Sequence, residues 1–148
     1  MNKPAKRGAR AEVDGQSLLS LILTVAGRLE DRLEAKLASQ GLSMAKANTL
    51  QCLAEASDPM ALSALAEGNA CVRSNITQLV DRLETDGLVR RVNDPDDRRV
   101  RRAALTISGR KACQAAHGVV SHQESEVARA FTRDEAATLG ELLRRLNS

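Results

Sequence analysis

The sequence predicts a mainly α-helical protein that carries one small β-hairpin. Its composition is rich in Leu, Ala, Arg and Glu, which favour helices, and its 148 residues include only three prolines. Apolar residues recur every three to four positions along most of the chain, which is the spacing of amphipathic helices. Near residue 95 this spacing gives way to two short segments around a polar turn. The length suits one domain with a single core.

In the N-terminal third of the chain, the sequence predicts a disordered arm followed by two helices. Residues 1–12 are polar and basic without periodicity, so we expect a disordered arm. From Gln16 to Gly41 apolar residues keep helical spacing, and the glycine ends the helix. Ser43 is the predicted N-cap of a second helix, which the turn at residues 57–59 stops.

A helix-turn-helix outline follows a short extended segment at residues 60–62. A short helix, Ser63 to Glu67, and a second helix from about Val72 to Asp86 are joined by a few residues that include Gly68. Apolar side chains line one face of the second helix and polar side chains line the other. One face therefore belongs to the core, and the other is free to contact a ligand.

A β-hairpin is predicted directly after the second helix of this motif. The strands are residues 88–92 and 100–105, and the turn between them contains Pro95. Thr106 or Ser108 then caps a long helix.

A last helix is predicted after a break near Phe131. Thr132 and Glu135 have the spacing of a capping box, and four leucines give the helix that follows an apolar face. The predicted fold class is therefore a winged helix-turn-helix flanked by long N- and C-terminal helices.

Positive charge is concentrated in one segment of the chain. The net charge is +3, but residues 71–111 carry ten cationic side chains against six anionic ones, and residues 1–12 are also cationic. The rest of the chain is acidic. Such a distribution is typical of a surface that binds a polyanion.

Several function classes find no support in the sequence. No apolar run approaches the length of a membrane span, and the first residues lack the apolar stretch of a signal peptide, so we expect a cytoplasmic protein without membrane contact. We find no catalytic arrangement of Ser, His, Asp or Cys and no glycine-rich phosphate loop, and we expect no enzyme activity, metal or cofactor. The three cysteines, Cys52, Cys71 and Cys113, are an odd number and argue against a disulfide framework.

About fifty consecutive residues carry a family resemblance. Residues 62–110 read LSALAEGNACVRSNITQLVDRLETDGLVRRVNDPDDRRVRRAALTISGR. They are similar to the core of the MarR (multiple antibiotic resistance regulator) family in the motifs Leu-x-x-Leu-Ala-Glu, Leu-Val-Asp-Arg-Leu-Glu, Gly-Leu-Val, Asp-Pro-x-Asp-x-Arg and Leu-Thr-x-x-Gly. Outside this core only the helical layout resembles the family.

The resemblance implies a transcriptional regulator that binds double-stranded DNA as a homodimer. Residues 13–148 would form one winged-helix domain, with a DNA-binding core at 62–110 and dimerisation helices at 13–57 and 112–148. It further implies a repressor that binds a pseudo-palindromic operator and is released by a small-molecule effector between the dimerisation helices and the core. The sequence does not identify the effector-binding residues.

The polar face of the second helix and the tip of the hairpin supply the candidate DNA contacts. Short polar groups suit phosphates, and a glutamine amide can form two hydrogen bonds with adenine. An arginine at the hairpin tip can enter a narrow minor groove, while a neighbouring carboxylate such as Asp97 pairs with another arginine and stiffens the loop. The candidates are Arg73, Ser74, Asn75, Thr77, Gln78, Arg98 and Arg99.

One departure from the family affects specificity. The family often has a basic residue at the position of Gln78, so the operator of this chain cannot be copied from relatives.

Three alternatives to a ligand-responsive DNA-binding protein follow from the same sequence. Cys113 and His117 share a helical face with Glu124, and His122 lies nearby, which is a fragment of a metal site. Cys71, at the start of the second helix, has a position that lowers thiol pKa values and favours redox sensing. The fold could also serve as a partner-binding module that does not bind nucleic acid.

Overall fold

A computed structural model describes residues 12–13, 15–56, 59–68, 73–97 and 99–146. The arm predicted at residues 1–12 lies almost entirely outside this range. The elements are, in order, β1 (Glu12–Val13), β2 (Gln16–Ser17), α1 (Leu18–Ala38), α2 (Met44–Glu55), β3 (Met60–Ala61), α3 (Leu62–Gly68), α4 (Arg73–Thr85), β4 (Val89–Asn93), β5 (Arg101–Leu105), α5 (Ile107–Ala128) and α6 (Arg133–Leu146). The predicted fold class is confirmed.

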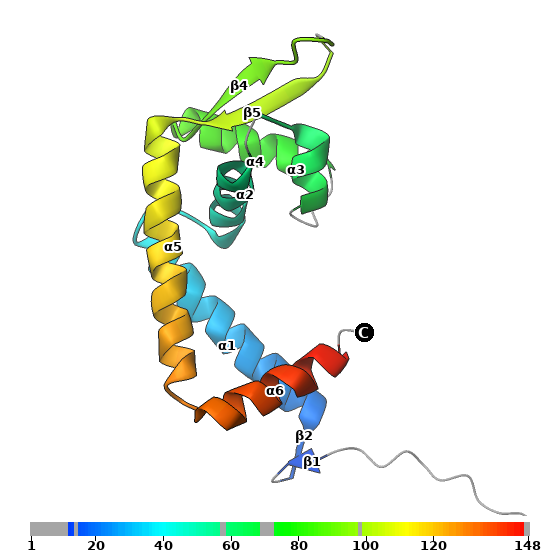
Figure 1. The fold of residues 1–148 in the computed structure, drawn as a ribbon, viewed down its shortest axis with the longest axis vertical. Helices are drawn as coiled ribbons and strands as arrows, with labels where there is room; N and C mark the ends of the chain where they lie inside the picture. The colour runs from blue at the N-terminus through cyan, green and yellow to red at the C-terminus, as the bar shows by residue number, and fades with distance from the viewer. Residues whose placement is uncertain (1–11, 14, 57–58, 69–72, 98, 147–148) are drawn as a thin grey trace, which may run out of the picture.

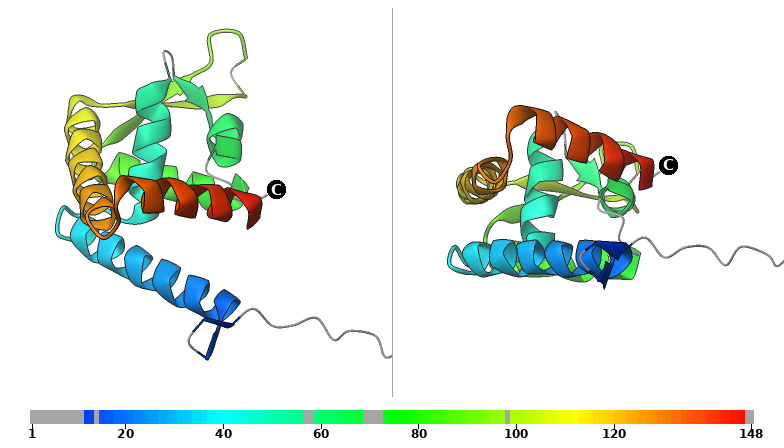
Figure 2. Two further views of the ribbon diagram at one scale, coloured as in Figure 1. Left: turned by 60° about the horizontal axis from the view of Figure 1, so that its bottom comes forward. Right: turned by 90° about the horizontal axis from the view of Figure 1, so that it is seen from below.

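The chain has the shape of a letter C, with α5 as its spine (Figure 1). A head made of α2, α3, α4 and the sheet β3-β5-β4 occupies the upper end of α5. Both sheet pairings are antiparallel, with Ala103 of β5 opposite Met60 on one side and Arg91 on the other. The helix α6 leaves the lower end of α5, and α1 extends from the middle of α5 toward the same side (Figure 1); the two helices are separated from each other (Figure 2).

The core lies inside the head and continues to the top of α1. Its largest fully buried aliphatic side chains come from five elements: Leu37, Leu50, Leu65, Ile76, Val80, Leu83 and Val89. Leu50 belongs to α2, within the segment that the resemblance assigns to dimerisation. The structure packs α2 against α4, α5 and β5, so this helix contributes to the core of the head.

The helix boundaries follow the predicted capping residues. The hydroxyl of Ser43 accepts a hydrogen bond from the Lys46 amide at 3.2 Å, and the hydroxyl of Thr106, rather than Ser108, caps α5. Thr132 and Glu135 form the expected reciprocal pair. The first helix begins at Leu18, two residues later than predicted, because Gln16 and Ser17 pair with β1.

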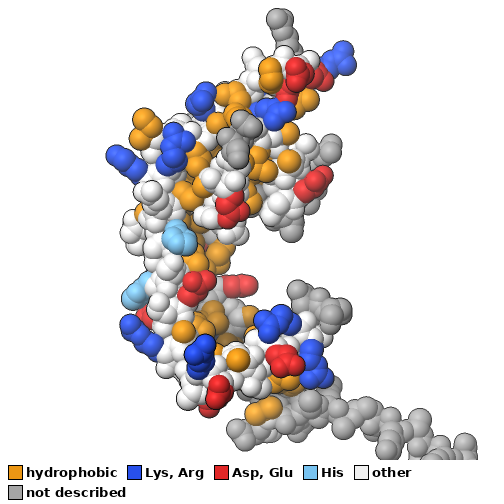
Figure 3. All heavy atoms as spheres, viewed as in Figure 1, with side chains coloured by type: hydrophobic (Ala, Val, Ile, Leu, Met, Phe, Trp, Pro, Cys, Tyr) orange, Lys and Arg blue, Asp and Glu red, His pale blue; other side chains and the backbone are white. Residues whose placement is uncertain are grey.

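The helices α1 and α6 bury little of their apolar surface. No residue of α6 is buried, although its leucines share one face. Leu19 and Leu23 of α1 are 66% and 62% exposed, and Leu146 of α6 is 66% exposed. Hydrophobic side chains are also visible on the inner side of the lower half (Figure 3). None of the described helices is long and apolar enough to span a membrane.

A close backbone approach fixes the start of α5 against the head. A Cβ atom at Gly109 would lie 1.9 Å from the carbonyl oxygen of Leu88, which no side chain tolerates. Gly87, the residue before Leu88, adopts a φ of +72° in the turn that follows α4, a backbone conformation that glycine adopts readily. The Leu-Thr-x-x-Gly motif is thereby explained, because Thr106 caps the helix and Gly109 allows the helix to touch Leu88.

We therefore predict opposite effects for two glycine-to-alanine substitutions in α5. Gly109→Ala should lower the free energy of unfolding by about 3 kcal/mol, because the methyl group forces the helix away from Leu88. Gly118→Ala is the control, since a Cβ there has no atom within 4 Å, and it should raise stability by about 0.5–1 kcal/mol. Urea denaturation measures both values. Equal stability of the two variants would contradict the predicted role of Gly109.

Candidate nucleic-acid interface

The two helices of the predicted helix-turn-helix are α3 and α4, and α4 carries the candidate contact surface. Ile76, Val80 and Leu83 are almost completely buried and attach one face of α4 to the core. The opposite face is exposed and includes Asn75 and Gln78. This amphipathic division matches the sequence pattern, and it leaves amide side chains free to reach the edges of bases.

The structure places the predicted contact residues on two neighbouring elements. Asn75, Thr77 and Gln78 are exposed on α4, and Arg99 is exposed on the hairpin between β4 and β5. Arg73 and Ser74 lie in the first turn of α4, but the positions of their side chains are outside the described part, as is Arg98 altogether.

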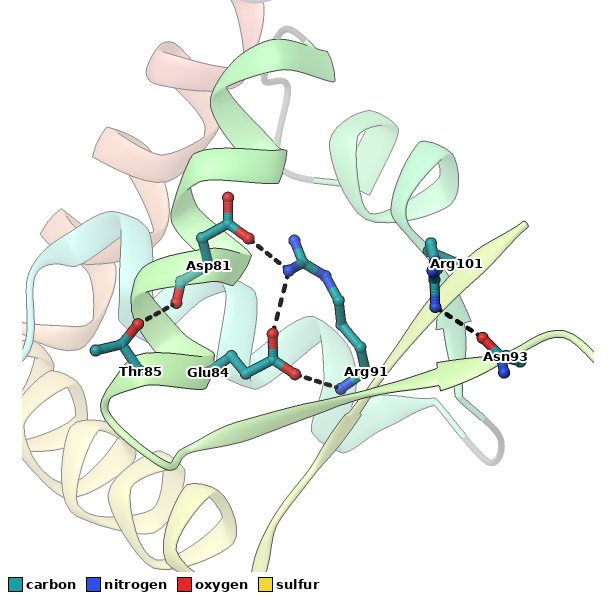
Figure 4. A network of polar contacts seen from close by, with 6 residues as sticks. All are labelled: Asp81, Glu84, Thr85, Arg91, Asn93 and Arg101. Atoms are coloured by element: carbon teal, nitrogen blue, oxygen red, sulfur yellow. Dashed lines mark hydrogen bonds and ion pairs between the residues drawn. The ribbon is translucent and has the colours of Figure 1, made fainter. Parts of the chain in front are cut away.

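Arg91 joins the hairpin to α4 through three polar contacts (Figure 4). Its Nη1 atom lies 2.5 Å from Oδ1 of Asp81 and 3.1 Å from Oε2 of Glu84, and its backbone amide donates to Oε1 of Glu84 at 3.1 Å. The arginine neutralises two carboxylates that would otherwise repel a polyanion. It also fixes the base of the hairpin relative to the exposed face of α4.

Asp94 organises the turn of the hairpin. Its side chain is 7% exposed, and Oδ1 accepts hydrogen bonds from the amides of Asp96 at 2.8 Å and Asp97 at 3.1 Å. Its Oδ2 atom pairs with the guanidinium of Arg102, which also donates to the carbonyl of Pro59 at 3.0 Å. The Asp96 amide and then Arg102 hold the pKa of Asp94 below its usual value.

Within the described residues, the ion pair that stiffens the turn joins Asp94 and Arg102. The expected pairing of Asp97 with an arginine of its own run stays a prediction for Arg98, which lies outside the described residues. Asp97 accepts a hydrogen bond from the backbone amide of Arg99 at 2.9 Å. Arg101 pairs with Asn93 across the strands at 2.8 Å (Figure 4).

Sequence reasoning missed the structural roles of Arg91, Asp94 and Arg102. The signal available was an Asp followed by Pro at the end of a strand, a pattern in which the carboxylate accepts hydrogen bonds from the next amides. Nothing in the sequence showed which of six arginines near the hairpin would face a carboxylate, because that depends on strand register.

The described cysteines have the chemistry of core residues. Burial raises the pKa of the thiols of Cys52 and Cys113, and Glu55 raises both further, so both favour the unreactive protonated form at neutral pH. Among the described residues, no group of three His, Cys, Asp or Glu side chains could hold a metal ion. Cys71, the candidate redox residue, lies outside the described part.

Comparison with known proteins gives consistent matches to one family. The model of the MarR family matches residues 42–100. Multiple antibiotic resistance protein MarR of Escherichia coli (strain K12) is 35% identical over 72 residues. The matched residues span 48% of this chain and 50% of the length of that relative.

Solved structures extend the likeness to most of the chain. A cysteine-to-serine mutant of MarR from E. coli, complexed with operator DNA, has a TM-score of 0.76 and 27% identity, and the alignment covers 87% of this chain and 92% of that one. A putative MarR-like transcription regulator from Bacillus cereus ATCC 10987 has a TM-score of 0.78 and 28% identity over 88% and 93%. The MepR–DNA complex of S. aureus, 20% identical with a TM-score of 0.80 over 88% and 96%, shares the fold.

These matches agree with the arrangement of the elements and with the motifs of residues 62–110. The matched proteins are regulators of transcription and not enzymes. Residues 42–100 of the chain match the MarR family, and the fold over most of the chain is that of winged helix-turn-helix transcription regulators of this family.

Proposed function

We propose that the protein is a sequence-specific DNA-binding repressor that binds a pseudo-palindromic operator as a homodimer. The observation that carries this proposal is the exposed polar face of α4, which Arg91 fixes beside the hairpin. In this geometry α4 enters the major groove and the hairpin acts as a wing toward the minor groove. The 27% identical MarR mutant was solved in complex with operator DNA, which supports DNA binding by this fold.

The contacts are divided between reading bases and holding the phosphate backbone. We assign the first role to Gln78, with Asn75 and Thr77 beside it on α4, and assign backbone or base contacts at the first turn to Arg73 and Ser74. Arg98 and Arg99 hold the duplex from the wing. Such backbone contacts depend on charge and therefore on salt, whereas base contacts depend on sequence.

A second copy of this chain covers the apolar faces of α1 and α6. Together with the adjacent end of α5 and the turn after it, these faces contain ten large hydrophobic side chains that are at least 36% exposed: Leu18, Leu19, Leu23, Val25, Val127, Phe131, Leu139, Leu142, Leu143 and Leu146. Their burial between two copies would give a twofold symmetric dimer. The two α4 helices would then meet half-sites about one helical turn, roughly 10 bp, apart.

A small-molecule effector has a suitable place near these helices. A hollow of about 500 Å³ lies between α1, α5 and α6 and is lined mainly by apolar side chains, among them Leu33, Val120, Phe131 and Leu143. Its size is typical of small-molecule sites. A ligand that binds there more tightly in a conformation unfit for the operator would release the DNA.

The division of roles between helix and wing predicts two distinct defects. Gln78→Ala should cost about 1–3 kcal/mol on the best operator and relax the base preference at one symmetric position, with the salt dependence unchanged. The double variant Arg98→Ala with Arg99→Ala should weaken binding to most duplexes and flatten the slope of log K against log salt by about one to two units per subunit. Fluorescence anisotropy against single-base operator variants at several salt concentrations measures both.

Two variants away from the interface serve as controls. Gln114→Ala on α5 and Arg129→Ala at its lower end are exposed and should bind DNA like the wild type. If the double arginine variant binds like the wild type at every salt concentration, the wing does not hold DNA, and a module that binds no nucleic acid becomes the better explanation.

The buried carboxylate of the wing predicts a pH-dependent contribution to stability. Because the pKa of Asp94 is lower in the folded state, its contribution is complete above the unfolded value of about 3.9 and is lost as the pH falls through the folded value. Asp94→Asn should therefore be less stable than the wild type at pH 7, and this difference should shrink below about pH 4. It should also weaken DNA binding, because the turn loosens.

Thermal unfolding between pH 7 and pH 3 measures this difference. Asp96→Asn is the matched control, since that exposed carboxylate has no partner among the described residues. A difference between the wild type and Asp94→Asn that stays constant over the whole pH range would contradict the assigned role of the Asp94 charge.

The proposed dimer interface predicts that polar substitutions on α6 produce monomers. Replacing both Leu142 and Leu146 by Gln removes two exposed leucines per subunit, which should weaken association by at least about 3 kcal/mol, roughly a hundredfold. Sedimentation velocity at micromolar concentration measures the change, and circular dichroism verifies folding. Ala137→Gln, on the opposite face of α6, should leave the dimer intact. A wild-type monomer at the same concentration would refute the interface.

A further inference from the structure

The head contains a second hollow, far from α1 and α6. It has a volume of about 540 Å³ and lies between the end of α2, the strand β5 and the first turn of α5. The elements around it are held rigidly, because Thr106 and Gly109 lock the start of α5 against Leu88. A preformed hollow of this size is typical of small-molecule sites.

Two arginines with no ionic partner line this hollow. Arg90 and Arg110 have neither an ion pair nor a side-chain hydrogen bond within the described ranges, and no Asp or Glu is among the lining residues. The neighbouring arginines of the same hairpin differ, because Arg91 and Arg102 pair with carboxylates and Arg101 with Asn93. The hollow therefore offers guanidinium donors to an anion that none of the described residues supplies.

The remaining lining is aliphatic. Leu53, Pro59, Leu105 and Ile107 contribute, together with four alanines. Ile107 is 71% exposed, the largest exposed fraction of any large hydrophobic side chain described. No aromatic ring lines the hollow, so a flat ligand finds nothing to stack on. An aliphatic chain of a ligand, in contrast, would bury its own apolar surface and that of the lining side chains.

We propose that this hollow is a binding site for a medium-chain aliphatic carboxylate. The carboxylate accepts hydrogen bonds from Arg90 and Arg110, and the hydrocarbon chain lies against Ile107 and the alanines of β5. The site uses none of the residues assigned to DNA contacts or to the dimer. It therefore does not depend on the proposed function, and it can be tested on the protein without DNA.

The test is a titration of the full-length protein with octanoate below its micelle-forming concentration, followed by methyl NMR. We expect saturable shifts of the Ile107 and Leu105 methyl signals. Octanol lacks the charge and acetate lacks the chain, so both should bind at least about tenfold more weakly, as expected for the loss of a charge-assisted hydrogen bond or of apolar contact.

Variants locate the site. Arg90→Gln and Arg110→Gln should each weaken octanoate binding by about tenfold. Lys111 lies next to Arg110 in the same helix turn but does not line the hollow, so Lys111→Gln removes the same charge and should bind octanoate like the wild type. Ala54→Leu fills the hollow without a change of charge and should also abolish binding, which keeps the proposal testable if an arginine variant fails to fold.

Three results would overturn the proposal. They are the absence of saturable binding, equal affinity for octanol and octanoate, and equal octanoate affinity of the Lys111→Gln and arginine variants. If the arginine variants lose affinity only for duplex DNA, Arg90 and Arg110 are phosphate contacts and the hollow is not a carboxylate site.

Discussion

The contact between Thr106, Gly109 and Leu88 determines how the rest of the molecule is arranged. The Thr106 amide donates to the Leu88 carbonyl at 3.1 Å, and its hydroxyl lies 2.7 Å from the carbonyl of Gly87. The same hydroxyl accepts from the Gly109 amide at 2.9 Å. One turn of chain thus joins the end of α4, the start of β4 and the first turn of α5. The orientation of α4 relative to α5 follows from this junction.

Ion pairs in the head remove negative charge from the surface that we assign to DNA. Asp81 and Glu84 pair with Arg91, and Asp94 pairs with Arg102. Arg82 and Arg99 have no ionic partner among the described residues. The excess of positive charge in residues 71–111 is therefore concentrated in side chains that face solvent, where a polyanion can reach them. Exposed charges without partners do little for folding but contribute to association.

The sequence predicted every helix and the hairpin because these elements depend on local rules. Caps such as Ser43 and Thr106 and the apolar stripe of α4 act over a few residues. The pairing of Gln16 with β1 was missed, since two-residue ladders leave no periodic signal. The partners of Arg91 and Arg102 were also missed, because strand register and rotamers decide them. The candidate contacts on α4 were predictable because the apolar pattern of this helix shows which face is exposed. The hollow beside Arg90 is lined by residues between 53 and 110 and leaves no local pattern in the sequence.

The connection between the lower helices and the head gives the proposed regulation a physical route. Besides the spine, α1 reaches the head where Glu34 accepts a hydrogen bond from the Met44 amide at 2.7 Å, at the start of α2. Lys36 ties α1 to α5 through Gln123 at 2.9 Å. A ligand between α1, α5 and α6 would therefore act on both connections at once. In a symmetric dimer such a change moves both α4 helices, and because half-site spacing is fixed by the DNA helix, both contacts weaken together.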